Sequence, residues 1–231
     1  MNPFSRLMRA ATGAASRISI RSKLLVMGVV FIVPVIVMSW MTGKRLGAEI
    51  AVAETERAGV HFLAPARDVL SAVQLHRGTS QLALAGDQRA GERLAAVAKK
   101  VDDALLQIEN LAKTHSGLQV AGGVAGLQAK WSGIKSKTGA LSAADDFKAH
   151  TAVAEEVLAF LGLVGDSSGL ILDPEIETFY LMNAAVSQLP KIIELSALTR
   201  GLAAGAAARK SVTDDEAARL TMMQHLVARE E

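Results

Sequence analysis

Residues 24–41 read LLVMGVVFIVPVIVMSWM, a run of eighteen residues without a charged side chain. Extended to Gly43 and wound as an α-helix at 1.5 Å per residue, this run is long enough to span a hydrocarbon layer about 30 Å thick. Trp40 lies near its distal end, a position typical of aromatic residues at a membrane interface. The sequence therefore predicts a transmembrane helix over residues 24–43.

The segment before this run is basic and contains no acid. Its charged residues are Arg6, Arg9, Arg17, Arg21 and Lys23. Because positively charged flanks stay on the cytoplasmic side, we expect the N-terminus inside the cell and the chain after about residue 44 outside. Arg21, Lys23 and Trp40 are the residues expected at the membrane interfaces. The predicted division is a basic cytoplasmic tail (1–23), a membrane helix (24–43) and an extracytoplasmic domain (44–231).

Two other interpretations of the apolar run, a cleaved signal peptide and a buried core helix, fit its surroundings less well. A cleaved signal peptide would need a site such as Ala51-Val52-Ala53, but that tripeptide lies about ten residues beyond the run and follows Lys44 and Arg45. A buried core helix does not explain why the run is uncharged throughout and carries a basic flank on one side only. An uncleaved anchor is the interpretation we favour.

The composition of the whole chain favours an all-α fold. Aromatic residues make up 4% of the chain, and Ala, Leu, Val, Gly, Glu, Lys and Arg dominate it. There is no cysteine, which excludes disulfides, thiolate metal sites and a cysteine nucleophile. The high pI comes from the basic tail, and no basic patch interleaves with aromatic residues, so we expect no nucleic-acid partner.

Turn residues and apolar stripes predict successive helices after the anchor. Their expected ranges are about 44–85, 88–114, 118–137, 142–165, from Asp173-Pro174 onward with a fade over 201–208, and from Thr213 to the end. Two apolar stripes step by three and four: Leu94, Val97, Val101, Ala104, Ile108 and Leu111; and Phe179, Met182, Val186, Leu189 and Ile193. We expect a four-helix type of bundle, or two stacked bundles, outside the membrane. The last helix has no stop signal, so we expect a truncated sequence, a genuinely short protein being the alternative.

Two segments resemble parts of a known receptor family. They are residues 165–182 (GDSSGLILDPEIETFYLM) and residues 65–87, which contain Gln74, His76-Arg77-Gly78 and Gly86-Asp87. With the basic tail and the membrane helix, they resemble the opening region of bacterial methyl-accepting chemotaxis proteins and related sensor kinases. The resemblance implies a two-pass receptor of the inner membrane, and we expect it to pair as a homodimer. Its periplasmic helices would bind a small molecule and pass a small helix displacement across the membrane to output domains that this chain does not contain.

No arrangement of residues in the sequence predicts catalysis. The five histidines include no pair spaced for one helix face, and H-E-x-x-H and G-x-S-x-G are absent. Asp145-Asp146 and Glu155-Glu156 are expected to be solvated or capping residues. We therefore predict a chain that is not an enzyme and that needs no cofactor or metal. Alternatives are the sensor region of a membrane histidine kinase or of a cyclic-dinucleotide enzyme, and a single-pass anchored scaffold that binds a protein partner.

Candidate ligand-binding residues come from a polar stripe and from the resemblance. Arg67, Gln74, Arg77 and Gln81 are spaced by seven, three and four, so they share one helix face. If that face is interior, two guanidinium groups could bind a small anion; the alternative is a solvated face. Tyr180 lies in the segment that resembles chemoreceptors. Its alternative role is that of a core residue whose hydroxyl is satisfied locally. Asp173, in the same segment, is expected to be a helix cap. The candidate ligand residues are Arg67, Gln74, Arg77 and Tyr180.

Overall fold

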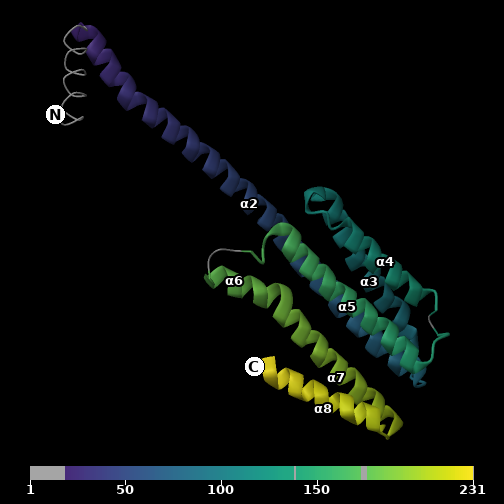
Figure 1. Ribbon diagram of the computed structural model, residues 1–231. Coiled ribbons are helices and arrows are strands. Elements are labelled where there is room, and N and C mark those ends of the chain that lie inside the picture. Colours follow the sequence, from purple (N-terminus) through teal and green to yellow (C-terminus); the bar gives the residue numbers. More distant parts are fainter. Residues whose placement is uncertain (1–18, 138, 173–175, 231) are drawn as a thin grey trace. The chain divides into compact units, whose positions relative to one another are not determined.

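The computed structural model describes residues 19–137, 139–172 and 176–230, and all regular structure in these ranges is helical (Figure 1). The elements are α2 (Ile20–Leu84), α3 (Gln88–Thr114), the 3-10 turn η1 (Ser116–Leu118), α4 (Ala121–Lys135), α5 (Ala143–Ser168), α6 (Ile176–Asn183), the π-helical turn η2 (Ala184–Gln188), α7 (Leu189–Arg209) and α8 (Asp214–Glu230). The all-α prediction is confirmed. The predicted start of a helix at Asp173-Pro174 lies outside the described residues, as does most of the basic tail.

The chain divides into two units, Met1–Val52 and Ala53–Glu231. The described part of the first unit is the N-terminal portion of α2, where every side chain is exposed and only Gly28 is half-buried. An 18-residue window of α2 has a mean hydropathy of 2.6 and is 0% buried. Among the described helices, α2 alone is long and apolar enough to cross a membrane.

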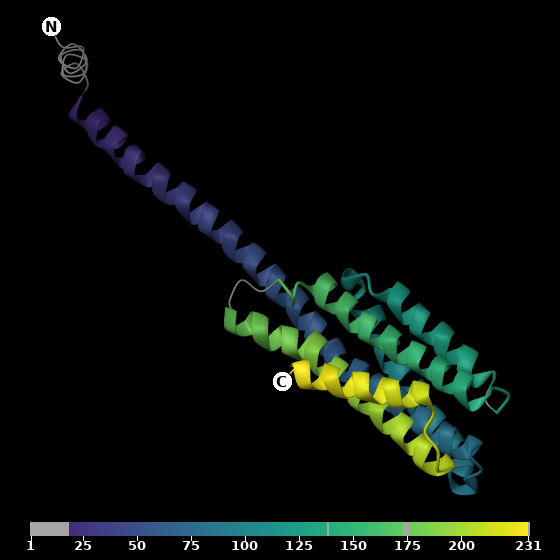
Figure 2. The same cartoon turned by 60° about the horizontal axis from the view of Figure 1, so that its bottom comes forward.

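The second unit has one hydrophobic core to which four helices contribute. Its members include Phe62 and Val69 of α2, Ile108 of α3, Leu127 of α4 and Leu161 of α5, each fully buried. Helix α4 packs against both α3 and α5, and α7 packs against α5 and α8; Figure 2 shows α4 and α5 side by side. The stripe predicted on α3 is confirmed, with Val97, Val101, Ala104 and Ile108 buried and Leu94 and Leu111 half-buried.

Side-chain caps fix the starts of three helices where the sequence predicted them. Asp87 accepts a hydrogen bond from the backbone N–H of Ala90 at 3.2 Å, which places the start of α3. Ser142 accepts from the N–H of Asp145 at 3.1 Å ahead of α5. Thr213 and Glu216 cap each other's backbone N–H groups ahead of α8, which is a capping box.

The stripe predicted over α6 and α7 is wrong at most of its positions. Of its five residues only Val186 is buried, while Phe179, Leu189 and Ile193 are 37%, 52% and 46% exposed. The reason is local: Pro190 has no N–H to donate back to Val186, and the preceding turn widens to η2, where the N–H of Leu189 bonds to the carbonyl of Ala184. A π turn inserts one residue, so a stripe counted at 3.6 residues per turn does not continue through it.

Helix α7 is longer than the sequence predicted. We expected it to fade over residues 201–208 because glycine and alanine are dense there, but it runs to Arg209. A Cβ at Gly201 would lie 3.0 Å from Cε2 of Phe147 on α5. The glycine therefore lets α7 approach α5 closely, and this packing outweighs the poor helix propensity of glycine.

Candidate functional site

Four polar residues of α2 are buried in the second unit. Gln74, His76, Arg77 and Ser80 are 8%, 1%, 2% and 4% exposed. Arg77 is the largest fully buried side chain in the described part of the chain. Burying such groups costs several kcal/mol unless each finds a partner, so their partners identify the contacts that the fold depends on.

Arg77 and Gln74 both bind Glu194 of α7. Nη1 of Arg77 donates to Oε1 of Glu194 at 2.7 Å, and Nε2 of Gln74 donates to Oε2 at 2.7 Å. Nη1 of Arg77 also donates to the hydroxyl of Thr151 on α5 at 3.1 Å, and the guanidinium lies 5.1 Å from the ring centre of Phe147. Glu194 is itself only 3% exposed. One buried carboxylate thus links α7 to α2, while the same arginine reaches α5.

His76, which precedes Arg77 in the sequence, pairs with His150 of α5. Nδ1 of His76 and Nε2 of His150 are 2.7 Å apart, and the two rings are stacked with centres 4.9 Å apart. Burial lowers the pKa of His76 to about 4, helped by His150 and opposed by Asp102. Burial also lowers the pKa of His150, opposed by Asp146. Both rings are therefore neutral at pH 7.

Two carboxylates flank the histidine pair, and each has its own partners. Asp146 accepts from Nε2 of Gln81 at 3.0 Å and lies 3.4 Å from Nδ1 of His150. Asp102 of α3 accepts from Nε1 of Trp131 and from Nζ of Lys135, both at 2.7 Å. Burial acts to raise the pKa of Asp102, but the hydrogen bonds from Lys135 and Trp131 outweigh it, so the pKa is lowered. The expectation that Asp146 is solvated or capping is wrong, because it is 3% exposed and faces inward from the first turn of α5.

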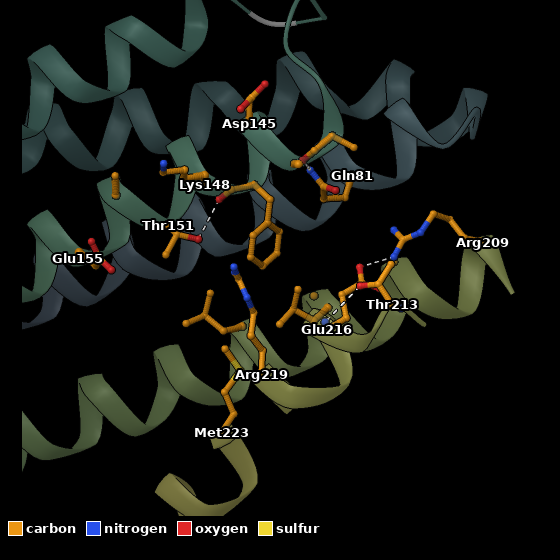
Figure 3. Close-up of a pocket in the computed structure, with 18 residues that line it drawn as sticks. Gln81, Asp145, Lys148, Thr151, Glu155, Arg209, Thr213, Glu216, Arg219 and Met223 are labelled. Carbon is orange, nitrogen blue, oxygen red and sulfur yellow. Dashed lines mark hydrogen bonds and ion pairs between the residues drawn. The ribbon is translucent and has the colours of Figure 1, made fainter. Parts of the chain in front are cut away.

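A cavity of about 770 Å³ lies between α5, α7 and α8 (Figure 3). Its charged lining includes Lys148, Glu155, Arg209, Glu216 and Arg219. Arg209 donates to Glu216 across the turn that joins α7 to α8, so part of this charge is already paired. The cavity carries both signs of charge and shows no preference for an anion or a cation.

A second cavity, of about 600 Å³, lies between α2 and α7. Gln74 and Arg77 line it together with Arg200 and Arg209, and no acidic residue is part of its lining. The space exists because α7 presents small side chains there, among them Ala197, Gly201 and Ala204. Arg77 and Arg209 are paired with Glu194 and Glu216, and Arg200 adds a further guanidinium group to largely apolar walls, which suits a small organic anion.

The structure brings together only two of the four candidate ligand residues. Gln74 and Arg77 share Glu194 and line the second cavity. Arg67 is exposed, and its Nε donates to the carbonyl of Leu63 one turn earlier at 3.3 Å. Tyr180 is 65% exposed beside Phe179, so it is not the core residue that the alternative interpretation required.

The residues predicted for the membrane interfaces lie in the first unit. Arg21, Lys23 and Trp40 are all exposed on α2. Nζ of Lys44 lies 4.6 Å from the ring centre of Trp40, one turn further along the helix.

Sequence reasoning missed Glu194, His150 and Asp146. Glu194 interrupts the apolar run Ile192-Ile193-Glu194-Leu195, and an acid in such a run is a signal of a buried, paired carboxylate that could have been noticed. His150 is 74 residues from His76, and no local pattern connects them. Within the described ranges no group of three or more metal-ligating side chains is present.

No protein-family model, curated protein or solved structure matches the chain.

Proposed function

We propose that the chain is the sensory portion of a membrane-anchored signalling receptor of the chemoreceptor type, without catalytic activity of its own. The observation that carries the proposal is the composition of α2. One helix of 65 residues contains the apolar run over residues 24–43 and also the buried residues Gln74, His76 and Arg77. A change in packing around those residues acts on the helix that carries the anchor.

The ligand in this proposal is a small organic anion with an apolar part, bound in the cavity between α2 and α7. Arg200, in a lining without acidic residues, supports an anion; Arg77 and Arg209 also line the cavity, but each is already paired with a glutamate. Because Glu194 links α7 to α2, a ligand in this cavity binds beside the contact that sets their spacing. Binding that favours one spacing shifts the population of two helix arrangements, which is how a displacement of an ångström or two becomes a signal.

A thermal-shift measurement on the purified chain tests the ligand. The panel contains acetate, benzoate, succinate, citrate, nitrate and phosphate, with chloride as the salt control. At least one carboxylate is expected to raise the melting temperature, since a ligand of the folded state stabilises it. Arg200→Gln is expected to remove the shift, because Arg200 lines the cavity and is exposed.

Arg67→Gln is the matched control for that variant. Arg67 is also an exposed arginine, but it does not line the cavity, so its substitution is expected to leave the shift intact. If no member of the panel stabilises the chain, or if both substitutions have the same effect, this cavity is not an anion site.

The proposal also places the anchor in the bacterial inner membrane, with the N-terminus in the cytoplasm and residues after about 44 in the periplasm. The chain has no cysteine, so single cysteines can be introduced one at a time. In intact cells a membrane-impermeant maleimide is expected to label Thr114→Cys and to label Ser16→Cys only after lysis. The reverse pattern would overturn the orientation, and recovery of both variants in the soluble fraction would overturn the anchor.

A second candidate is an anchored helical scaffold that binds a protein partner. Exposed apolar side chains on α6 and α7 favour it: Ile176, Phe179, Leu181, Leu189 and Ile193. The receptor proposal assigns this surface to a second copy of the chain in a homodimer. Mass measurement by light scattering in detergent distinguishes the two, since a dimer at micromolar concentration supports the receptor and a monomer favours the scaffold.

A further inference from the structure

The His76–His150 pair plays no part in the proposed anion site. Neither histidine lines the cavity between α2 and α7, yet both are buried, at 1% and 0% exposed. His76 belongs to α2 and His150 to α5. The same two helices also approach closely at Gly59 and Ser168, and Nε2 of Gln81 donates to the carbonyl of Ala143. The pair is thus a titratable contact at the centre of the interface between these two helices.

The hydrogen bonds around the pair fix where its protons lie. Nδ1 of His150 is 2.7 Å from the backbone carbonyl oxygen of Asp146, which can only accept, so Nδ1 of His150 carries a proton. In the neutral ring Nε2 of His150 is then an acceptor, and the proton in the 2.7 Å contact belongs to Nδ1 of His76. His76 therefore donates to His150, and His150 donates to the carbonyl of Asp146. The nitrogen of the pair that carries no proton and accepts none from the other ring is Nε2 of His76, so a further proton binds there.

We propose that the second unit binds a proton at Nε2 of His76 as a stimulus, and that this protonation loosens the contact between α2 and α5. The proposal concerns a response to acid and does not depend on the anion site. It adds a proton to an existing base and requires no other reactant.

The carboxylates around the pair do not fully offset the cost of burying an added charge, since burial is the largest influence on the pKa of both rings and lowers it. On α2, Arg77 is positive and is neutralised by Glu194 of α7. On α3, Asp102 is paired with Lys135 of α4 at 2.7 Å and accepts from Trp131. On α5, Asp146 accepts from the neutral amide of Gln81 and lies 3.4 Å from Nδ1 of His150, so it faces the far ring of the pair and not Nε2 of His76. The ring of Trp131 lies edge-on to His76, with centres 4.9 Å apart. A histidinium at His76 is buried, and the nearest carboxylates offset only part of that cost, so the packing that buries it becomes unfavourable.

The expected range for the response is mildly acidic. Burial lowers the pKa of His76 to about 4, against an ordinary value of 6.5. An arrangement in which α2 and α5 separate enough to hydrate the ring restores the ordinary value. Between pH 6.5 and about 4 that arrangement binds a proton and the closed one does not, so acid shifts the population toward it.

A second pair of stacked histidines provides an internal control. The rings of His61 and His115 are 5.7 Å apart, but His61 is exposed and His115 half-buried. Stacking of two imidazoles is therefore common to both pairs, whereas burial and the 2.7 Å contact belong to His76 and His150 alone.

Histidine NMR on the full chain in nanodiscs tests the proton assignment directly and needs no substitution. With ¹⁵N-labelled histidine, His76 and His150 are expected as Nδ1–H tautomers at pH 7.5. On acidification they are expected to remain neutral to well below pH 6.5, the ordinary pKa of histidine, until the loosened state is populated. Ordinary titration of His76 near pH 6.5, or an Nε2–H tautomer at His150, would overturn the proposal.

Spin-label distances test the movement. The chain has no cysteine, so labels go on Ser71→Cys of α2 and Glu155→Cys of α5, both exposed positions. Between pH 7.5 and 4.5 the distance distribution is expected to shift by on the order of 1–2 Å or to broaden. The variant His76→Asn/His150→Gln places an amide donor opposite an amide acceptor, with nothing to titrate, and is expected to keep its neutral-pH distribution.

His115→Gln is the control and is expected to respond to acid as the parent does. An unchanged distance in the parent, or an equal shift in the His76→Asn/His150→Gln variant, would refute the proton as the cause. If that double variant does not fold, the tautomers and titration of the parent decide the matter alone.

Discussion

The two parts of α2 reverse the usual relation between polarity and burial. From Ile20 to Val52 the helix is largely apolar, and side chains such as Leu24, Val30 and Ile36 are 63%, 60% and 60% exposed. From Ala53 to Leu84 it carries charged residues, and Arg77 among them is 2% exposed. The two parts belong to one continuous helix and differ in their side chains and in what surrounds them.

The difference shows that burial depends on partners and not on hydropathy alone. An apolar surface that extends around a whole helix is unfavourable in water, which is why the first part points to an apolar solvent. In the second part each buried charge has a partner on another helix, so the cost of removing it from water is offset. The predictions below test each part of this contrast.

The largest effect is expected from charges in the apolar part. Val29→Asp/Val33→Asp places two acids in the middle of the run, each costing about 2.5–3.5 kcal/mol in a membrane. The variant is expected to leave the washed membrane fraction, as measured by sedimentation and immunoblotting. Ser71→Asp/Leu75→Asp has the same spacing on exposed positions of the other part and is expected to sediment like the parent. Equal behaviour of the two variants would contradict the contrast.

Removal of the buried carboxylate is expected to have the next largest effect. Glu194→Ala leaves Arg77 charged and without its carboxylate partner, which costs about 3–5 kcal/mol in the free energy of unfolding. Urea denaturation measures this change in the free energy of unfolding. Arg77→Met/Glu194→Leu removes both charges and is expected to cost much less than the two single changes together. Arg67→Ala, at an exposed position, is expected to change stability by about 0.5 kcal/mol or less.

Because His76 and His150 are buried, we expect the free energy of unfolding to fall in mild acid. Unfolded His76 binds a proton below about pH 6.5, whereas the folded ring binds one only below about 4. The stabilisation is complete above pH 6.5 and is lost as the pH falls toward 4, by about 3 kcal/mol from His76. Urea denaturation from pH 7.5 to 4.5 is expected to show this slope in the parent, and a flat profile in His76→Asn/His150→Gln would confirm its origin.

The smallest effect is expected where α2 meets α5. A Cβ at Gly59 would lie 2.3 Å from Oγ and 2.4 Å from Cβ of Ser168, so Gly59→Ala forces the helices apart and is expected to cost about 1–3 kcal/mol. Gly78 on the same helix has no atom within 4 Å of such a Cβ, and Gly78→Ala is expected to be neutral or to stabilise by about 0.5–1 kcal/mol. Thermal denaturation of both variants checks the pair, and a loss of stability in Gly78→Ala would contradict it.

The sequence predicted the elements better than their faces. Caps at Asp87, Ser142 and Thr213 are local hydrogen bonds, and the helices they begin were placed correctly. The stripe on α3 was also correct, because no break interrupts it. The stripe over α6 and α7 failed because a π turn before Pro190 changes the register, and a pattern at 3.6 residues per turn does not reveal such a turn.

The candidate site was predicted only in part for a similar reason. Gln74 and Arg77 were found because they share a helix face within one turn, and that spacing is visible in the sequence. Glu194 and His150 lie 117 and 74 residues from their partners, beyond the range of any helical period.

By itself, the sequence determined that this protein is helical, that one of its helices can cross a membrane, and where most helices begin. These properties depend on composition, on runs of apolar residues and on caps, all of which act within a few residues. Only the tertiary structure decided that Arg77 meets Glu194, that His76 meets His150, and that Tyr180 and Ile193 stay exposed. Such pairings depend on which faces of distant helices pack together, and that is set by the balance of the whole core.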